Sequence, residues 1–175
     1  MPLALRAFDN VHAQHPDARL VVVGDGPLRR SLQASHPHVH FVGLQRGSEL
    51  AAHYASADVF LFPSLSETFG NVTLEALSSG LAVVAFDAAA AGELIRHGRN
   101  GLLAPAGDAD GFVRAACAAI GSGTVALRAD AVGALRARAR LTALASDWEP
   151  VLHRFEQRLA ALANPIESFG HASLA

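Results

Sequence analysis

The sequence predicts an α/β protein in which helices cover both faces of a Rossmann-like, doubly wound parallel sheet. Short apolar runs, such as residues 20–23 and 58–62, alternate with longer segments whose apolar residues recur at helical spacing. A strand that is apolar on both faces belongs in a parallel sheet buried between layers of helices, because a half-exposed strand would alternate apolar and polar residues. We therefore expect an open, doubly wound α/β domain.

The first part of the chain is expected to hold three helices and three strands. In order, these are helix 3–14, strand 20–23, helix 28–35, strand 36–42, helix 49–55 and strand 58–62. Pro16 ends the first helix, and Pro27 opens the second, since proline is tolerated in the first helical turn. Ser48 is the expected N-cap of the third helix.

The rest of the chain continues the alternation and then becomes helical. The expected elements are helix 71–79, strand 83–86, helix 88–96, a brief strand at 102–103, and helices over 109–120, 125–145 and 147–163. Gly80 can adopt the left-handed conformation that commonly ends a helix, and Asp108 is a suitable cap for the helix that follows it. We expect one domain over residues 1–163 and a flexible tail over 164–175, which shows no periodicity.

The composition excludes several classes of protein. The 175 residues are 51% hydrophobic, enough for one core, but they contain neither an apolar run of about 18 residues nor a basic, apolar leader. A net charge of −2 argues against a nucleic-acid partner, which would require a clustered basic face. The single cysteine, Cys117, permits no internal disulfide and favours a cytoplasmic location. All 14 basic residues are arginine, so a cationic contact to phosphate must come from arginine or histidine.

The segment 64–80, which follows strand 58–62, holds the candidate site. In open α/β sheets, ligands bind beyond the carboxyl ends of the strands, near the N-termini of helices. Gly70 would let a ligand approach the backbone, and the first amides of helix 71–79, with the helix dipole, favour a phosphate or diphosphate. Glu75 could accept both hydroxyls of a ribose, and Glu67 could accept hydroxyls of an attached sugar. An ordinary strand–loop–helix with two solvated glutamates would show the same pattern, so both interpretations stay open.

Four segments carry a more specific signal. In order, they are VVVGDGPLRRSL, VHFVGL, ADVFLFPSLSETFGNVTLEALSSGLAVVAF and GRNGLLAPAGD. They resemble the C-terminal, donor-binding half of retaining glycosyltransferases of the family-four type (glycosyl transferases group 1, GT-B fold), and the resemblance covers residues 3–160. It implies a hexosyl-type enzyme that transfers a sugar from a nucleoside-diphosphate-sugar donor, such as a UDP- or GDP-sugar, with retention at the anomeric carbon. No metal or other cofactor is implied.

The resemblance also implies roles for individual residues. As the catalytic residue, Glu67 would contact the donor sugar and position it for transfer, and Glu75 would bind the ribose. The other implied substrate-binding positions are the backbone of Phe69, Gly70 and Asn71 for sugar hydroxyls, Val72 and Thr73 for the diphosphate, and Leu44 and Gln45 for the base.

The chain departs from the family pattern in three ways. The family's donor-binding domain begins with a central strand and a loop carrying an Arg and a Lys, and neither this strand nor the N-terminal acceptor domain is found in the sequence. Alanines over 88–91 replace the usual Gly and Pro. We expect a truncated or incompletely sequenced enzyme, inactive as a fragment, whose missing acceptor domain could attach it peripherally to the inner membrane. The alternatives are a non-catalytic nucleotide-sugar-binding module and a sugar-nucleotide epimerase.

Two clusters could suggest a metal site. Asp108 and Asp110 resemble an acidic metal-binding pair of other glycosyltransferases, but their place at the start of a helix favours capping. His36, His38 and His40 would share one face of strand 36–42 and could bind a metal, although a partly exposed strand is the simpler interpretation.

The last predicted helix has one apolar face. Its members are Trp148, Val151, Leu152, Phe155, Leu159 and Leu162. This face could lie on a membrane, but packing on the domain is favoured, or crossing to a partner domain as the resemblance implies.

Overall fold

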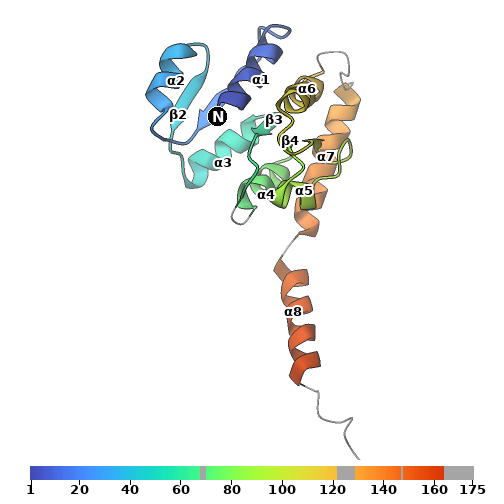
Figure 1. Cartoon of the computed structure of the whole chain (residues 1–175). Coiled ribbons are helices and arrows are strands. Elements are labelled where there is room, and N and C mark those ends of the chain that lie inside the picture. The colour runs from blue at the N-terminus through green and yellow to red at the C-terminus, as the bar shows by residue number, and fades with distance from the viewer. Residues whose placement is uncertain (68–69, 122–128, 147, 164–175) are drawn as a thin grey trace, which may run out of the picture. The chain divides into compact units, whose positions relative to one another are not determined.

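The computed structural model of the chain describes residues 1–67, 70–121, 129–146 and 148–163. The chain divides into two compact units, Met1–Ala143 and Leu144–Ala175. The first unit holds the strands and the candidate site (Figure 1). In the second, the described residues include helix α8 (Trp148–Ala163), on which the spacing of Leu152, Phe155 and Leu159 puts them on one face. The single domain expected over residues 1–163 stays a prediction.

The predicted alternation of strands and helices is confirmed. The strands are β1 (Val21–Val23), β2 (His40–Gly43), β3 (Val59–Phe62), β4 (Ala82–Phe86) and β5 (Leu102–Ala104). The helices before α8 are α1 (Pro2–His12), α2 (Arg29–Ser35), α3 (Gly47–Ser56), α4 (Asn71–Ser78), α5 (Ala89–Leu94), α6 (Ala109–Ala119) and α7 (Ala129–Ala145). No helix in the described part of the chain is long and apolar enough to cross a membrane.

The strands pair in parallel, as the sequence predicts. One sheet joins β1 to β2, and a second has the order β3-β4-β5. In the second sheet, Phe60 lies opposite Val83, and Val84 lies opposite Leu102. The described strands are therefore hydrogen bonded in two separate groups.

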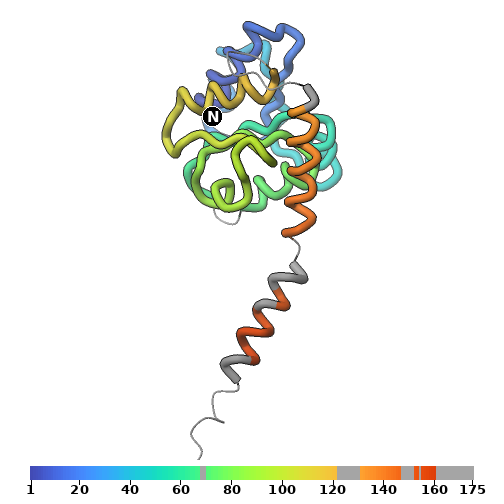
Figure 2. The backbone as a smooth tube through the Cα atoms, turned by 90° about the vertical axis from the view of Figure 1, so that its right-hand side faces the viewer, coloured from blue at the N-terminus to red at the C-terminus, as the bar shows by residue number. Residues whose placement is uncertain are grey.

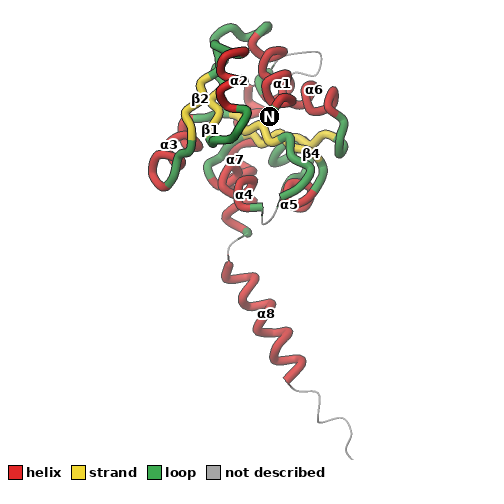
Figure 3. Tube along the Cα trace, turned by 60° about the vertical axis from the view of Figure 1, so that its left-hand side comes forward, coloured by secondary structure: helices red, strands yellow, loops and turns green. Residues whose placement is uncertain are grey.

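Alternate residues of β4 explain why helices cover both faces of the sheet. Ala82, Val84 and Phe86 belong to a core that includes α1 and α6. Val83 and Ala85 belong to a second core, on the other face, with α4, α5 and α7. All five residues are at most 4% exposed, so the strand is buried on both sides. Figure 3 shows this layering, with α1 and α6 on one side of the sheet and α4 and α5 on the other.

Helix α1 packs on both parts of the sheet. Leu5 and Phe8 form a core with Val39, next to partly buried residues of β1 and β2. Ala7 and Val11 belong to the core of the three-stranded sheet. The helix therefore connects β1-β2 to β3-β4-β5 through apolar contacts where backbone hydrogen bonds do not.

The prediction of a histidine-bearing strand over 36–42 is wrong. Strand β2 begins only at His40, because His36 is the C-cap residue of α2 and His38 lies in the turn that follows. The His38 ring stacks on that of His12 in α1, with ring centroids 5.5 Å apart. The three histidines thus do not share one face of a strand, and no group of three or more metal-binding side chains occurs among the described residues.

Two of the three predicted capping residues, Asp108 and Gly80, are confirmed. The Asp108 carboxylate accepts a hydrogen bond from the Gly111 amide at 2.8 Å, which is a true N-cap. Gly80, with φ +72°, follows α4 in the left-handed conformation. The Ser48 cap is wrong: Arg46, with extended backbone, is the N-cap residue, so Ser48 lies inside the first turn of α3.

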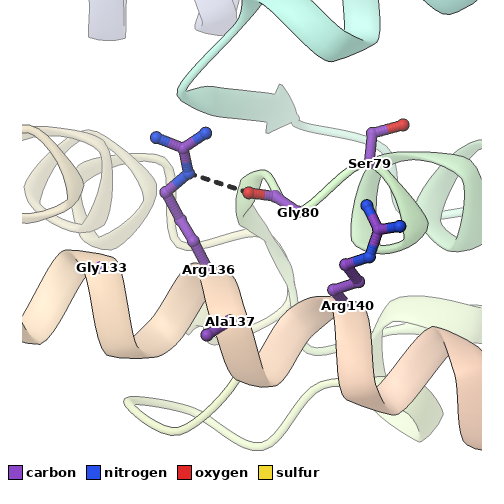
Figure 4. A pocket seen from close by; sticks show the side chains of 6 residues that line it. All are labelled: Ser79, Gly80, Gly133, Arg136, Ala137 and Arg140. Atoms are coloured by element: carbon purple, nitrogen blue, oxygen red, sulfur yellow. Dashed lines mark hydrogen bonds between the residues drawn. The ribbon is translucent and has the colours of Figure 1, made fainter.

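Arg136 of α7 ties this helix to the amino-terminal edge of the sheet. Its Nε donates to the Gly80 carbonyl at 2.8 Å, its Nη1 to Asp58 Oδ1 at 2.7 Å and its Nη2 to the Ala57 carbonyl at 3.5 Å. Figure 2 shows α7, in orange, running along the first unit. Figure 4 shows the bond to Gly80 beside an open pocket, which is lined by Ser79, Gly80, Gly133, Arg136, Ala137 and Arg140.

We expect an Arg136→Ala variant to be less stable than wild type by about 2 kcal/mol, because two backbone carbonyls and one carboxylate lose their donor. Urea unfolding followed by circular dichroism measures the loss. The matched control is Arg138→Ala, which removes an exposed arginine from the same helix and should change stability by less than about 0.5 kcal/mol. Equal unfolding midpoints for the two variants would show that the hydrogen bonds of Arg136 do not stabilise the fold.

Candidate functional site

The candidate site lies at the carboxyl-terminal edge of the three-stranded sheet. The chain leaves β3 after Phe62 and enters α4 at Asn71, so residues 63–70 connect a strand end to a helix start. Strand β4 runs parallel to β3, and therefore α5 begins at the same edge. Ligands of open parallel sheets bind at this edge. The pocket beside Arg136 lies at the opposite, amino-terminal edge and is separate from the site.

Glu67 is half-buried in the loop before α4. Its Oε2 accepts a hydrogen bond from the Thr73 hydroxyl at 3.3 Å, and Thr73 is fully buried in α4. Its Oε1 is also buried and has no partner among the described residues. A buried carboxylate oxygen left unpaired is costly, which makes Glu67 able to gain from a donor such as a sugar hydroxyl.

Gly70 is the point where the loop turns into α4. It is buried and has φ +76°, a conformation that favours glycine. A Cβ built at this position would lie 2.5 Å from Ala90 Cβ of α5 and 4.0 Å from Glu67 Oε2. The sequence suggested that glycine is needed for a ligand to approach; the structure adds that it is needed for α4 to pack against α5.

The amides at the start of α4 are candidate donors to a ligand; Asn71 and Val72 are exposed, whereas Thr73 is buried. The first backbone bond of the helix joins the Leu74 amide to the Gly70 carbonyl at 3.0 Å. The amides of Asn71, Val72 and Thr73 have no acceptor within the described ranges, and no side chain caps this helix end. With the positive end of the helix dipole, these amides can hold a phosphate or diphosphate group.

Glu75 lies one turn into α4, and its side chain is exposed. Its Oε2 accepts a hydrogen bond from the Tyr54 hydroxyl of α3 at 3.2 Å. Burial, followed by the negative charge of Glu75 and its hydrogen bond, raises the pKa of Tyr54 to about 12. Tyr54 is the site residue that the sequence did not point to, since nothing in the spacing of 54 and 75 links them.

The raised pKa of Tyr54 predicts a loss of stability in alkali. The folded state holds the phenol proton more tightly than the unfolded chain, whose value is 10.0, so this contribution is complete below pH 10 and is lost as pH rises toward 12. Urea midpoints measured at about pH 9 and pH 11 should fall more for wild type than for Tyr54→Phe, which has no proton to lose there. An equal fall of the urea midpoint in wild type and Tyr54→Phe would show that Tyr54 does not contribute to this loss of stability.

The remaining predicted residues are only partly placed. Leu44 and Gln45 follow β2 at its carboxyl end; Leu44 is exposed, and the Gln45 amide donates to the Val42 carbonyl at 2.9 Å. Phe69 lies outside the described residues. Ala89, one of the alanines that replace glycine and proline, has φ +47°, so glycine would fit this position better.

The acidic pair before α6 is engaged in other contacts. Asp108 caps α6 and pairs with Arg114 at 3.4 Å. Asp110 accepts a hydrogen bond from Arg6, which lowers the pKa of that carboxyl. Capping is therefore the role that the structure gives Asp108, as the position predicted.

Several curated proteins similar to this chain are named as mannosyltransferases or as another glycosyltransferase. A GDP-mannose-dependent alpha-mannosyltransferase of Mycobacterium tuberculosis is 50% identical over 90 residues, which are 51% of this chain and 24% of the relative. The sulfoquinovosyl transferase SQD2 of Arabidopsis thaliana is 41% identical over 116 residues, 63% of this chain and 22% of the relative. A phosphatidyl-myo-inositol mannosyltransferase of Mycobacterium leprae is 34% identical over 138 residues, 77% of this chain and 37% of the relative. The chain thus spans 22–37% of the length of these relatives.

Solved structures show the same fold. HepE of Anabaena in complex with UDP superposes with a TM-score of 0.74 at 21% identity, over 92% of this chain and 45% of that chain. The C-terminal domain of a glycosyl transferase group 1 family protein from Francisella tularensis gives a TM-score of 0.71 at 21% identity, over 82% and 77% of the two chains. This likeness confirms the predicted Rossmann-like domain of the GT-B type.

The family model described as Glycosyl transferases group 1 matches residues 1–122. That match begins at the first residue of the chain and ends just after α6, so it includes both parts of the sheet and all the predicted site residues. The chain therefore belongs to the glycosyl transferases group 1 family.

Proposed function

We propose that this chain is the donor-binding part of a glycosyltransferase that transfers a hexosyl group from a nucleoside-diphosphate sugar to an acceptor. One observation carries the proposal: Glu67 and Glu75 flank the start of α4, whose first amides have no acceptor among the described residues, at the carboxyl edge of the sheet. The amides suit a diphosphate, and the carboxylates suit the hydroxylated groups that a diphosphate joins. Membership of the family supports the same class of substrate.

Each group in the site has a proposed part in holding the donor. Glu75 accepts the ribose hydroxyls, and Glu67 accepts hydroxyls of the donor sugar through the oxygen that has no described partner. The other proposed contacts are the backbone of Phe69, Gly70 and Asn71 to sugar hydroxyls, the amides of Val72 and Thr73 to the diphosphate, and Leu44 and Gln45 to the base.

Transfer with retention requires the acceptor hydroxyl to attack the anomeric carbon on the face from which the diphosphate leaves. The bond from this carbon to the diphosphate oxygen breaks, a bond to the acceptor oxygen forms, and the acceptor proton passes to the departing diphosphate. The amides of α4 stabilise the charge that develops on the diphosphate, while Glu67 orients the sugar. We propose that these amides, with arginine or histidine, supply the positive charge for which other enzymes use a metal.

The relatives support a nucleotide-sugar donor and leave its identity open. The Mycobacterium tuberculosis relative is named for GDP-mannose, whereas the HepE structure contains UDP. Because the chain spans 22–37% of the curated relatives described above, we propose that an N-terminal domain outside this chain binds the acceptor. That domain would also provide any peripheral association with the inner membrane, on the cytoplasmic side.

A second candidate function is a nucleotide-sugar-binding module without catalysis. It is favoured by the fact that every proposed contact in this chain is to the donor and none is to an acceptor. An epimerase of similar architecture is a third candidate and would change the donor sugar without any acceptor.

Turnover assays separate the candidates. The chain is mixed with UDP- and GDP-sugars, either alone or with the N-terminal acceptor domain of a group 1 glycosyltransferase and the acceptor of that enzyme, and nucleotide release is followed. The proposed enzyme releases nucleotide only when the acceptor domain and acceptor are present, and a binding module releases none in either mixture. Conversion of the sugar by the chain alone would support the epimerase instead.

A further inference from the structure

We propose that Tyr54 is a positioning residue for Glu75, holding its carboxylate in place to receive the ribose of a nucleoside diphosphate. This inference rests on the proposed donor site and adds a residue to it. The bond itself is a donation from the Tyr54 hydroxyl to Glu75 Oε2 at 3.2 Å, between the last turn of α3 and the first turns of α4.

Tyr54 is suited to act as a fixed anchor. Its ring is partly buried, packing against the ring of Phe60 in β3, with centroids 5.8 Å apart, and against the core on the α4 side of the sheet. An aromatic ring held in a core has few conformations, so its hydroxyl has a defined position. The hydroxyl therefore presents a donor to Glu75 from a rigid part of the molecule.

Glu75 is the group that needs such an anchor. Its side chain is exposed, and an unrestrained glutamate samples many rotamers that a bound ligand would have to restrict. A carboxylate that is already oriented loses less entropy when it accepts hydroxyls, and this raises affinity. The Tyr54 bond occupies one oxygen, Oε2, through one of its lone pairs, so the carboxylate keeps capacity for further donors.

The Tyr54 hydroxyl stays protonated at neutral pH. Burial, Glu75 and Glu67 together keep the phenol un-ionised, and these two carboxylates are the titratable groups that act on it. The bond to Glu75 is therefore not a switch but a constant restraint below about pH 10.

The chain contains a single tyrosine, so its ionisation can be measured without interference from another. Tyrosinate absorbance at alkaline pH should show less ionisation for wild type than for Glu75→Gln at the same pH, with circular dichroism verifying that both are folded. Glu93→Gln, which removes an exposed carboxylate from α5, is the control and should titrate like wild type. A Glu75→Gln curve that coincides with wild type would show that the bond is not formed, and would overturn the inference without reference to any ligand.

Tyr54→Phe then tests the role in binding, because it removes the hydroxyl and keeps the ring in the core. In calorimetry with UDP and GDP, we expect about threefold to tenfold weaker binding of the nucleotide that wild type prefers. The variant should bind the matching dideoxynucleotide, which lacks both ribose hydroxyls, as wild type does. In a Glu75→Ala background, Tyr54→Phe should cause no further loss.

The outcomes distinguish this inference from the proposed function. If Glu75→Ala weakens nucleotide binding but Tyr54→Phe does not, the positioning role of Tyr54 is overturned. The proposed donor site is then unaffected. If Tyr54→Phe weakens binding of the nucleotide and of the dideoxynucleotide equally, Tyr54 acts on the fold of the site rather than on the ribose contact. This result would also overturn the positioning role. A folded wild type that binds neither UDP nor GDP would overturn the proposed function itself, and the positioning role with it.

Discussion

A Glu75→Ala variant is expected to bind nucleoside diphosphates about 100-fold more weakly than wild type. The carboxylate is proposed to accept two ribose hydroxyls, and hydrogen bonds to a charged group contribute about 1.5–3 kcal/mol each. Because this carboxylate is exposed, we take the lower value for both bonds, about 3 kcal/mol in all, which corresponds to about 100-fold. The side chain is exposed, so its removal should lower the stability of the fold by only about 1 kcal/mol, through the loss of the acceptor of the Tyr54 hydroxyl. Isothermal titration with UDP and GDP measures the affinity, and urea unfolding measures the stability.

The matched control for this variant is Glu93→Ala. It removes an exposed glutamate from α5, at the same edge of the sheet, without touching the proposed ribose contact. If Glu93→Ala and Glu75→Ala weaken binding equally, the effect is one of general negative charge, and Glu75 has no specific role.

A Gly70→Ala variant is expected to lose both binding and stability. Its Cβ would meet Ala90 Cβ at 2.5 Å, so the start of α4 must move away from α5. The left-handed conformation adds about 1–2 kcal/mol for an alanine, and the contact adds about 1–3 kcal/mol. Since Glu67 and the free amides lie on either side of Gly70, the same movement displaces the groups that hold the diphosphate and the sugar.

Gly98→Ala is the control that separates the cost of backbone strain from the cost of the contact with Ala90. Gly98 has φ +72°, close to the +76° of Gly70, but a Cβ there would meet nothing within 4 Å. It lies in the connection that leads into the amino-terminal end of β5, away from the site. We expect Gly98→Ala to lose stability through backbone strain only and to keep nucleotide affinity. Comparable loss of affinity in both variants would contradict the role given to the α4–α5 contact.

The sequence predicted the elements that its local pattern determines. The apolar run that became β4 is buried on both faces, and the Asp108 cap needs only the amide of Gly111, three residues away. The glutamates and the start of α4 were found for the same reason, since they lie within one continuous segment. Their proposed ligand roles came from the family resemblance rather than from the spacing of the two glutamates.

The features that the sequence did not reveal depend on residues far apart in the chain. Arg136 bonds to Asp58 across 78 positions, and Tyr54 bonds to Glu75 across 21. The stacking of His38 on His12 of α1, just before β2, is a contact that no pattern within residues 36–42 could indicate. Side-chain contacts of this kind are determined by tertiary packing, and the local spacing of residues does not indicate them.

The start of α4, between Glu67 and Glu75, is proposed to hold a nucleoside diphosphate. The most direct test is a titration of the isotopically labelled chain with UDP and with GDP, in which the backbone amide resonances are followed by NMR. We predict saturable shifts centred on residues 67–75, with α6 unaffected, and their loss in Glu75→Ala. A folded chain whose amides in this segment do not shift at millimolar nucleotide, or shift no more than those of α6, would contradict the claim.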